Sequence, residues 1–262
     1  MQPNSSIKTV LFIFGFLTLA TANPVLINAD LIAFYNFEGN ANDVTGNGND
    51  GMVNGATLSV DGYEGMGYDF DGVNDSIDIM LDINPTSFAS LTMGAWVNAR
   101  SLGQRVIISN DNGGFDRTLT LDDRGTGSGD RFSAFTGSGV VSAGSDPAIL
   151  NEWVFVAARY SQVSSQLVLD VDDDRQTVMT SLGNGNSTLQ IGRNPGFADV
   201  FDGTIDNVFF FDEVLSDARI DQIRAGGAAA ITGVPEPSLA ITCFVFGAAC
   251  CLVRKRSKQI WQ

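Results

Sequence analysis

The chain has 262 residues and a formal net charge of −15 at pH 7, and it contains no histidine. Such an acidic chain repels nucleic acid, so no nucleic-acid partner is expected. The missing histidine removes the commonest general base, the commonest zinc ligand and every Ser-His or Cys-His nucleophile pair. All three cysteines lie within residues 243–251, so no disulfide is expected in the rest of the chain.

Residues 1–22 have the three parts of a secretory signal peptide. Lys8 supplies the charged start, VLFIFGFLTLA supplies the apolar stretch, and Ala20-Thr21-Ala22 supplies the small-residue cleavage site. The apolar stretch is too short for a comfortable membrane span, which argues against the alternative of an N-terminal anchor. We therefore expect a secreted protein that is cleaved after Ala22.

The middle of the chain is a succession of short apolar runs separated by Gly, Asn and Asp. The expected strands are residues 31–37, 51–59, 67–71, 75–81, 91–99, 105–109, 117–122, 131–136, 152–160, 166–172, 175–180, 188–193 and 203–212. They are too many for a small barrel and suit an all-β fold of two antiparallel sheets packed as a sandwich. Because no internal repeat is evident, one domain over residues 23–227 is expected.

One short helix is expected at the end of this domain. Ser216 is a suitable N-cap, Asp217 favours the positive start of a helix, and Gly226 is typical of a helix end. Residues 228–233 are then expected to form a linker.

Six stretches resemble, in order and spacing, the laminin G-like (LamG type 3) branch of the concanavalin A-like lectin/glucanase superfamily. They are LIAFYNFEGNANDVTGNGNDGMVNGATL, YDFDGVNDSIDI, LTMGAWVNA, NEWVFVAARY with QLVLDVDD, STLQIGRN, and FDGTIDNVFFFDEVLSDARIDQI. The resemblance covers about residues 30–226 and implies a jelly roll of two curved antiparallel sheets. The chain departs from the family at Asp172-Asp173-Asp174, where members usually carry an Asp-Gly hairpin turn, so the turn type is open there.

The loop EGNANDVTGNGNDG (38–51) is predicted to hold a structural calcium ion. Glu38 and Asp43 lie in it, and the resemblance places Asp206 in a strand near the first one, which would bring three carboxylates together. Calcium binds six to eight oxygens, and the Gly/Asn-rich region 47–48 could add a backbone carbonyl. The alternative is an ordinary loop that is hydrogen-bonded to itself and leaves these carboxylates in solvent.

Two other acidic patterns are interpreted as structural. Asp170, Asp172 and Asp174 match the start of an EF-hand loop, but Arg175 replaces the required glycine and Ser181 the bidentate glutamate, so a solvated hairpin turn is expected. The five glutamates are scattered, and no Glu-x-Asp-x-x-Glu run supplies the carboxylate pair of a retaining glycosidase. We therefore expect no enzymatic activity.

The aromatic residues are expected to divide between core and surface. Trp96 and Trp153 lie in apolar strands and are predicted to be core residues. The remaining candidates for stacking on a sugar ring are Tyr63, Tyr68, Tyr160, Phe115 and Phe197. Loops 110–117 and 194–202 are candidate rims of a binding site.

The C-terminal 25 residues or so resemble a PEP-CTERM sorting signal. Pro235, Glu236 and Pro237 form the motif, residues 238–253 an apolar span, and residues 254–258 (RKRSK) a basic stop. The resemblance implies an exosortase-type processing enzyme as a partner and a transient stay in the inner membrane through residues 238–253. A permanent tail anchor is the alternative.

The sequence thus predicts a secreted, non-catalytic binding module that is sorted to the cell surface or the extracellular polymer matrix. Its expected partner is a polysaccharide or an extracellular protein. The alternatives are a glycoside hydrolase of the same superfamily and a passive structural component of the matrix.

Overall fold

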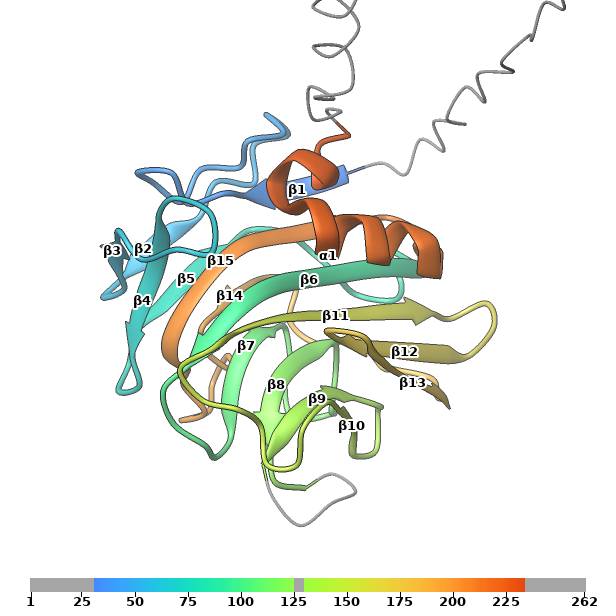
Figure 1. Ribbon diagram of the computed structural model, residues 1–262. Helices are drawn as coiled ribbons and strands as arrows, with labels where there is room; N and C mark the ends of the chain where they lie inside the picture. Colours follow the sequence, from blue (N-terminus) through green and yellow to red (C-terminus); the bar gives the residue numbers. More distant parts are fainter. Residues whose placement is uncertain (1–30, 125–129, 234–262) are drawn as a thin grey trace, which may run out of the picture.

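The computed structural model describes residues 31–124 and 130–233, and two antiparallel sheets face each other in it (Figure 1). The eight-stranded sheet has the order β13 (Asp174–Met179), β12 (Gln166–Val171), β11 (Trp153–Ser161), β6 (Ser90–Ala99), β15 (Asp202–Phe211), β4 (Gly67–Asp71) and β3 (Thr57–Ser59), with β1 (Leu31–Tyr35) also paired to β15. The seven-stranded sheet has the order β10 (Val140–Ala143), β9 (Arg131–Phe135), β8 (Thr118–Asp122), β7 (Arg105–Ser109), β14 (Leu189–Ile191), β5 (Ser76–Ile79) and β2 (Met52–Asn54). The predicted signal peptide with Ala22 and the predicted sorting signal with Pro235, Glu236 and Pro237 lie outside the described residues.

The main core lies between the two sheets because alternate residues of each strand face inward. In β6, Leu91, Met93 and Val97 are fully buried in this core, whereas Trp96 and Asn98 point to the outer face of the sheet. Burying side chains of this size stabilises the fold by about 1.5–3 kcal/mol each. The predicted all-β sandwich is confirmed.

The stretch 51–59, predicted as one strand, is two strands that belong to different sheets. β2 pairs with β5 in the seven-stranded sheet, and β3 pairs with β4 in the eight-stranded sheet. The chain turns between them at Gly55, whose φ of +85° and closeness to the Asp75 carboxylate leave no room for a side chain. A further strand, β10, is only four residues long and was not predicted from the sequence.

The single helix of the described residues, α1 (Asp217–Ile231), begins where the sequence predicts it. Ser216 is the N-cap, and its hydroxyl accepts a hydrogen bond from the backbone N–H of Arg219. The first helical stretch ends beside the predicted stop at Gly226, because Gly227 has non-helical angles, but the predicted linker from residue 228 is wrong, because helical structure resumes and continues to the buried Ile231. No helix in the described part of the chain is long and apolar enough to cross a membrane.

Helix α1 lies across the outer face of the eight-stranded sheet (Figure 1) and forms a second, smaller core with it. Ile220 and Ile223 pack there with Trp96, Phe155 and Phe209. The prediction that Trp96 is a core residue is therefore confirmed, but for this second core.

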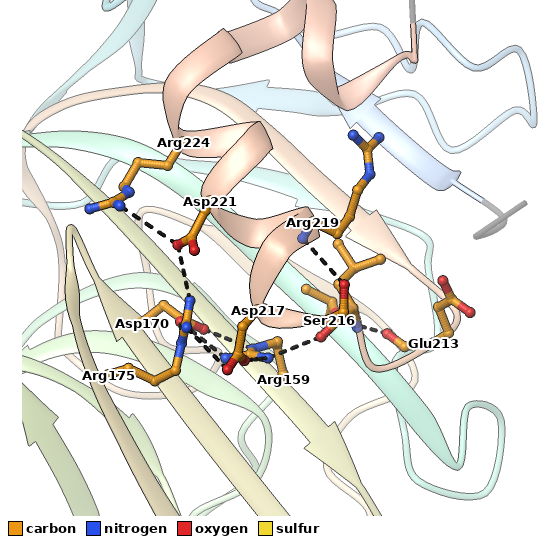
Figure 2. A network of polar contacts seen from close by, with 11 residues as sticks. Arg159, Asp170, Arg175, Glu213, Ser216, Asp217, Arg219, Asp221 and Arg224 are labelled. Atoms are coloured by element: carbon orange, nitrogen blue, oxygen red, sulfur yellow. Dashed lines mark hydrogen bonds and ion pairs between the residues drawn. The ribbon is translucent and has the colours of Figure 1, made fainter. Parts of the chain in front are cut away.

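An ion-pair network fixes the start of α1 to the same face (Figure 2). The guanidinium of Arg159 binds the carboxylate of Asp170 at 2.8 Å, and both side chains are almost completely buried. Arg159 also binds Asp217 of α1 at 2.7 Å, and Arg175 pairs with Asp170, Asp217 and Asp221. The network places α1 over one part of the sheet and leaves the rest of the outer face uncovered by it.

Candidate functional site

Asp43, one of the three predicted calcium ligands, is hydrogen-bonded mainly within its own loop. Its carboxylate accepts hydrogen bonds from the backbone N–H of Phe34, from both N–H and hydroxyl of Thr45, and from the backbone and side chain of Asn49. Burial opposes ionisation of Asp43, but these hydrogen bonds outweigh it and lower its pKa. The loop that contains Asp43 is therefore largely hydrogen-bonded to itself.

Glu38 and Asp206, the other two, lie close enough to repel each other. The Glu38 carboxylate accepts a hydrogen bond from the backbone N–H of Met66 at 2.9 Å. Asp206 is fully buried and accepts hydrogen bonds from the backbone N–H of Glu64 and of Asn207. Burial raises the pKa of Asp206 to about 7, with a further contribution from Glu38 and against the effect of these two N–H donors.

The three carboxylates do not assemble into one calcium site. In residues 31–124 and 130–233 no group of three or more Asp, Glu, Cys or His side chains has the geometry to hold a metal ion. The reason is that the oxygens of Asp43 are turned toward Phe34, Thr45 and Asn49. Of the three predicted ligands, Glu38 and Asp206 are the two that lie close together. Calcium binding by these two carboxylates stays a prediction.

The acidic run at Asp170–Asp174 forms a hairpin turn, as expected. β12 and β13 are joined through Asp172 and Asp173, and Asp172 has a φ of +50°. Asp170 faces Arg159 and Arg175, and Asp174 accepts a hydrogen bond from the backbone N–H of Gly144. The three carboxylates are therefore used separately in the fold and do not converge.

The five candidate stacking residues differ sharply in exposure. Tyr68 and Tyr160 are 6% and 1% exposed, which excludes them as sugar platforms. Tyr63 is 36% exposed, on the outer face of the eight-stranded sheet, and Phe197 is 42% exposed. Phe115 is partly exposed, and Gly113 of the same loop lies against Phe197, because a side chain added at Gly113 would place its Cβ 3.5 Å from that ring.

The loop 110–117 is organised by two buried aspartates. One oxygen of Asp111 accepts hydrogen bonds from the backbone N–H of Gly113 and of Asp116, both at 3.1 Å, and the other binds the Asn194 side chain. Asp116 accepts a hydrogen bond from the backbone N–H of Asn112. Burial raises the pKa of Asp116, and its neighbour Asp111 raises it further. These carboxylates hold the loop in shape.

A set of asparagines joins this loop to the loop 183–187. The side-chain oxygen of Asn84 accepts hydrogen bonds from Asn110 at 2.9 Å and from the backbone N–H of Gly185 at 2.7 Å. Asn186 donates to the backbone carbonyl of Asp111 at 2.9 Å. Asn84 and this second loop were not predicted from the sequence, although GNGNS (183–187) has the same Gly/Asn-rich composition as the loop 38–51.

The exposed or partly exposed groups on this scaffold are Asn112, Phe115, Asn184 and Phe197, which we call the rim site. Asn112 donates to the backbone carbonyl of Asn184 at 3.2 Å, so the two loops meet at the surface. Phe115 packs against Phe135 and the guanidinium of Arg124. Amide groups beside an exposed aromatic ring can hydrogen-bond hydroxyl groups while the ring covers an apolar face of a ligand.

The comparisons with known proteins agree with this fold. The family model for the concanavalin A-like lectin/glucanases superfamily matches residues 71–221, and no curated protein matches in sequence. Domain 4 of a GH43 extracellular arabinanase from Geobacillus stearothermophilus, solved with arabinotriose, is similar in structure, with a TM-score of 0.59 and 15% identity over 74% of this chain and 98% of that domain.

Two toxin structures are similar as well. The binding domain of botulinum neurotoxin serotype D has a TM-score of 0.59 and 14% identity over 76% of this chain. The binding domain of Paraclostridial Mosquitocidal Protein 1 has a TM-score of 0.58 and 15% identity over 74% of this chain. The match spans 52% and 51% of those chains, so this chain is similar to only about half of each of them. By its family match over most of the sandwich, the chain belongs to the concanavalin A-like lectin/glucanases superfamily.

Proposed function

We propose that this chain is a secreted, non-catalytic binding module, sorted to the cell surface or the extracellular polymer matrix, that recognises glycan or an extracellular protein through the rim site. The observation that carries the proposal is the exposed Phe197 next to a loop whose Asn112 amide is held at the surface. An amide and a ring in one place suit the alternating polar and apolar surface of a sugar better than a flat protein contact.

The relatives support a binding role in general terms. The arabinanase domain was solved with arabinotriose, and the toxin structures are described as binding domains. Their low sequence identity means that no ligand is carried over from them to this chain.

The proposal that the module is non-catalytic rests on the carboxylates of the rim. A retaining glycosidase needs two accessible carboxyl groups about 5–5.5 Å apart. Asp111 and Asp116 are adjacent, but they are 3% and 2% exposed and accept hydrogen bonds from the backbone of their own loop. Release of reducing ends from β-glucan or arabinan above a blank would contradict this part of the proposal.

Binding is tested with the purified full chain on a glycan array. The Phe197→Ala variant should lose at least tenfold in affinity for any glycan bound at the rim. Val163→Ala is the matched control, because Val163 is 86% exposed in a different loop. Equal binding by wild type and Phe197→Ala would move the site away from the rim.

Sorting is tested separately by mass spectrometry of the natural product. Processing after Ala22 and close to the Val234–Pro237 motif should give a chain of residues 23 to about 235. A C-terminal peptide that retains SLAITCFVFG would show a lasting membrane anchor instead.

A further inference from the structure

The part of the eight-stranded sheet that α1 leaves uncovered carries a row of polar side chains on its outer face. Strand register aligns one residue from each of five neighbouring strands: Trp153, Asn98, Thr204, Asp69 and Thr57. All five are partly or fully exposed. The row crosses four strand spacings, roughly 19 Å at about 4.8 Å each, which is long enough for an oligosaccharide.

One end of the row is closed by an aromatic corner. Tyr63 stacks on Trp96, with ring centroids 4.8 Å apart, and meets Trp153 edge-on at 6.0 Å and an interplanar angle of 68°. Trp96 is buried, but Tyr63 is 36% exposed and Trp153 is partly exposed. The prediction that Trp153 is a core residue is thus only partly right, because the indole covers the second core and also borders the open face.

The middle of the row offers an unused amide. The Asn98 side chain makes no hydrogen bond with any described residue, although it is flanked by Trp153 on β11 and Thr204 on β15. An amide has two donors and an acceptor, the groups that bind adjacent sugar hydroxyls. Free polar capacity beside an aromatic corner is what a sugar-binding surface requires.

One group of ion pairs offsets part of the negative charge beside the row. Arg100 binds Asp69 and, at 2.9 Å, Asp202, so one guanidinium offsets two carboxylates at the far side of the row. The carboxylate charge that remains, in a chain of net charge −15, disfavours anionic polymers. A neutral polyhydroxylated ligand is the class that matches both the charge and the hydrogen-bonding groups.

We propose that this open face, with Tyr63, Trp153, Asn98 and Thr204 as its contacts, is a second binding surface for a linear neutral oligosaccharide. It lies on the outer face of the eight-stranded sheet, whereas the rim site is built on the β7–β8 loop and on the loops before and after β14. The two surfaces share no residue, so this proposal stands or fails independently of the rim site.

Tryptophan fluorescence tests the proposal, because the rim site contains no tryptophan. The full chain is used with Trp261→Phe, since Trp261 lies outside the described residues. Cellohexaose, laminarihexaose and arabinotriose are the probes. At least one should give a saturable change in the emission of Trp96 and Trp153, which both contact Tyr63, and Asn98→Ala should weaken that binding at least tenfold without changing Tm.

Two variants separate this surface from others. Thr177→Ala, on β13 at the far edge of the same sheet, is the matched control and should bind like the wild type. Phe197→Ala should leave the fluorescence titration unchanged. If the signal is insensitive to all three probes, or if it is lost in Phe197→Ala and kept in Asn98→Ala, the open face is not a saccharide site, and in the latter case the rim site remains.

Discussion

Asp170 and Asp206 are both completely buried on the outer face of the eight-stranded sheet, but their surroundings differ. Asp170 lies between two guanidinium groups, those of Arg159 and Arg175. Asp206 has no described cation beside it and relies on two backbone N–H groups, with Glu38 as an unfavourable neighbour. Asp170 therefore has two positive charges beside it, whereas burial without a cation raises the pKa of Asp206 to about 7.

The difference shows that the cost of a buried carboxylate depends on its cross-strand partners. Register places Arg175 directly opposite Asp170, and Arg159 comes from the adjacent β11. Opposite Asp206 the register places Trp96, which cannot compensate a charge. Removing a partner should therefore destabilise the first site, whereas removing the charge should relieve the second.

The largest effect is expected from Arg159→Met, which removes one of the two guanidinium groups beside Asp170. It leaves Asp170 buried with Arg175 alone and should lower the free energy of unfolding by about 3–5 kcal/mol. Urea denaturation measures this loss. Arg100→Met is the matched control, because its exposed pairs with Asp69 and Asp202 should contribute no more than about 1 kcal/mol. Equal losses would mean that burial does not set the value of these pairs.

A bound calcium ion would give Asp206 the neighbouring cation that it lacks, and would thereby remove its difference from Asp170. At a free concentration 100-fold above its dissociation constant, calcium would add about 2.7 kcal/mol and raise Tm, and magnesium would not replace it. From the geometry we expect Asp206→Asn to abolish this response and Asp43→Asn to leave it intact. A response that disappears in Asp43→Asn would contradict the hydrogen-bonded loop, and an unchanged midpoint with chelator would end the calcium prediction.

The pH dependence of stability separates the two aspartates in the metal-free protein. Because burial raises the folded-state pKa of Asp206 to about 7, its contribution is full below the unfolded pKa and is lost as pH rises toward 7. The slope attributable to Asp206 should reach at most about 1.4 kcal/mol per pH unit. Urea titrations from pH 4 to 8 should show this fall in the wild type relative to Asp206→Asn. Parallel curves would contradict a raised pKa.

The smallest effect is expected from Glu64, which connects the Asp206 region to the end of α1. Its carboxylate accepts hydrogen bonds from the Asn207 side chain at 2.8 Å and from the backbone N–H of Ala228 at 2.7 Å. Glu64→Ala should cost about 1 kcal/mol, as the loss of a helix cap does. Glu64→Gln keeps an acceptor and should cost less. Loss of protection in hydrogen exchange should be confined to residues 228–231.

Most strands could be predicted from the sequence because alternation of apolar residues depends only on local pattern. The division of 51–59 between two sheets could not, because Gly55 is one glycine among many and only the tertiary fold shows Asp75 beside it. The helix start at Ser216 was visible as a cap, whereas its continuation past Gly227 depends on Glu64, 164 residues away from Ala228.

The candidate site was predictable only in part. Loop 110–117 and Phe197 were identified by composition, but the asparagines that join the loops come from distant parts of the chain, as with Asn84 and Gly185. The separation of Asp43 from Asp206 was also beyond the sequence, because it depends on which backbone N–H groups the Asp43 carboxylate finds. The spacing of residues along the sequence does not show the direction in which each side chain points.

The break at Gly227 has a mechanical consequence. A pull on Gly233 reaches the last turn of α1 first, where Glu64 binds the N–H of Ala228 and the Arg219 side chain binds the carbonyl of Ala230 at 2.7 Å. The first part of the helix, with its ion pairs to the sheet, is loaded only after that turn has opened. Helix α1 would thus detach from the sheet in two steps. Unfolding of its last turn would come first and would delay the transfer of a C-terminal force to the sandwich.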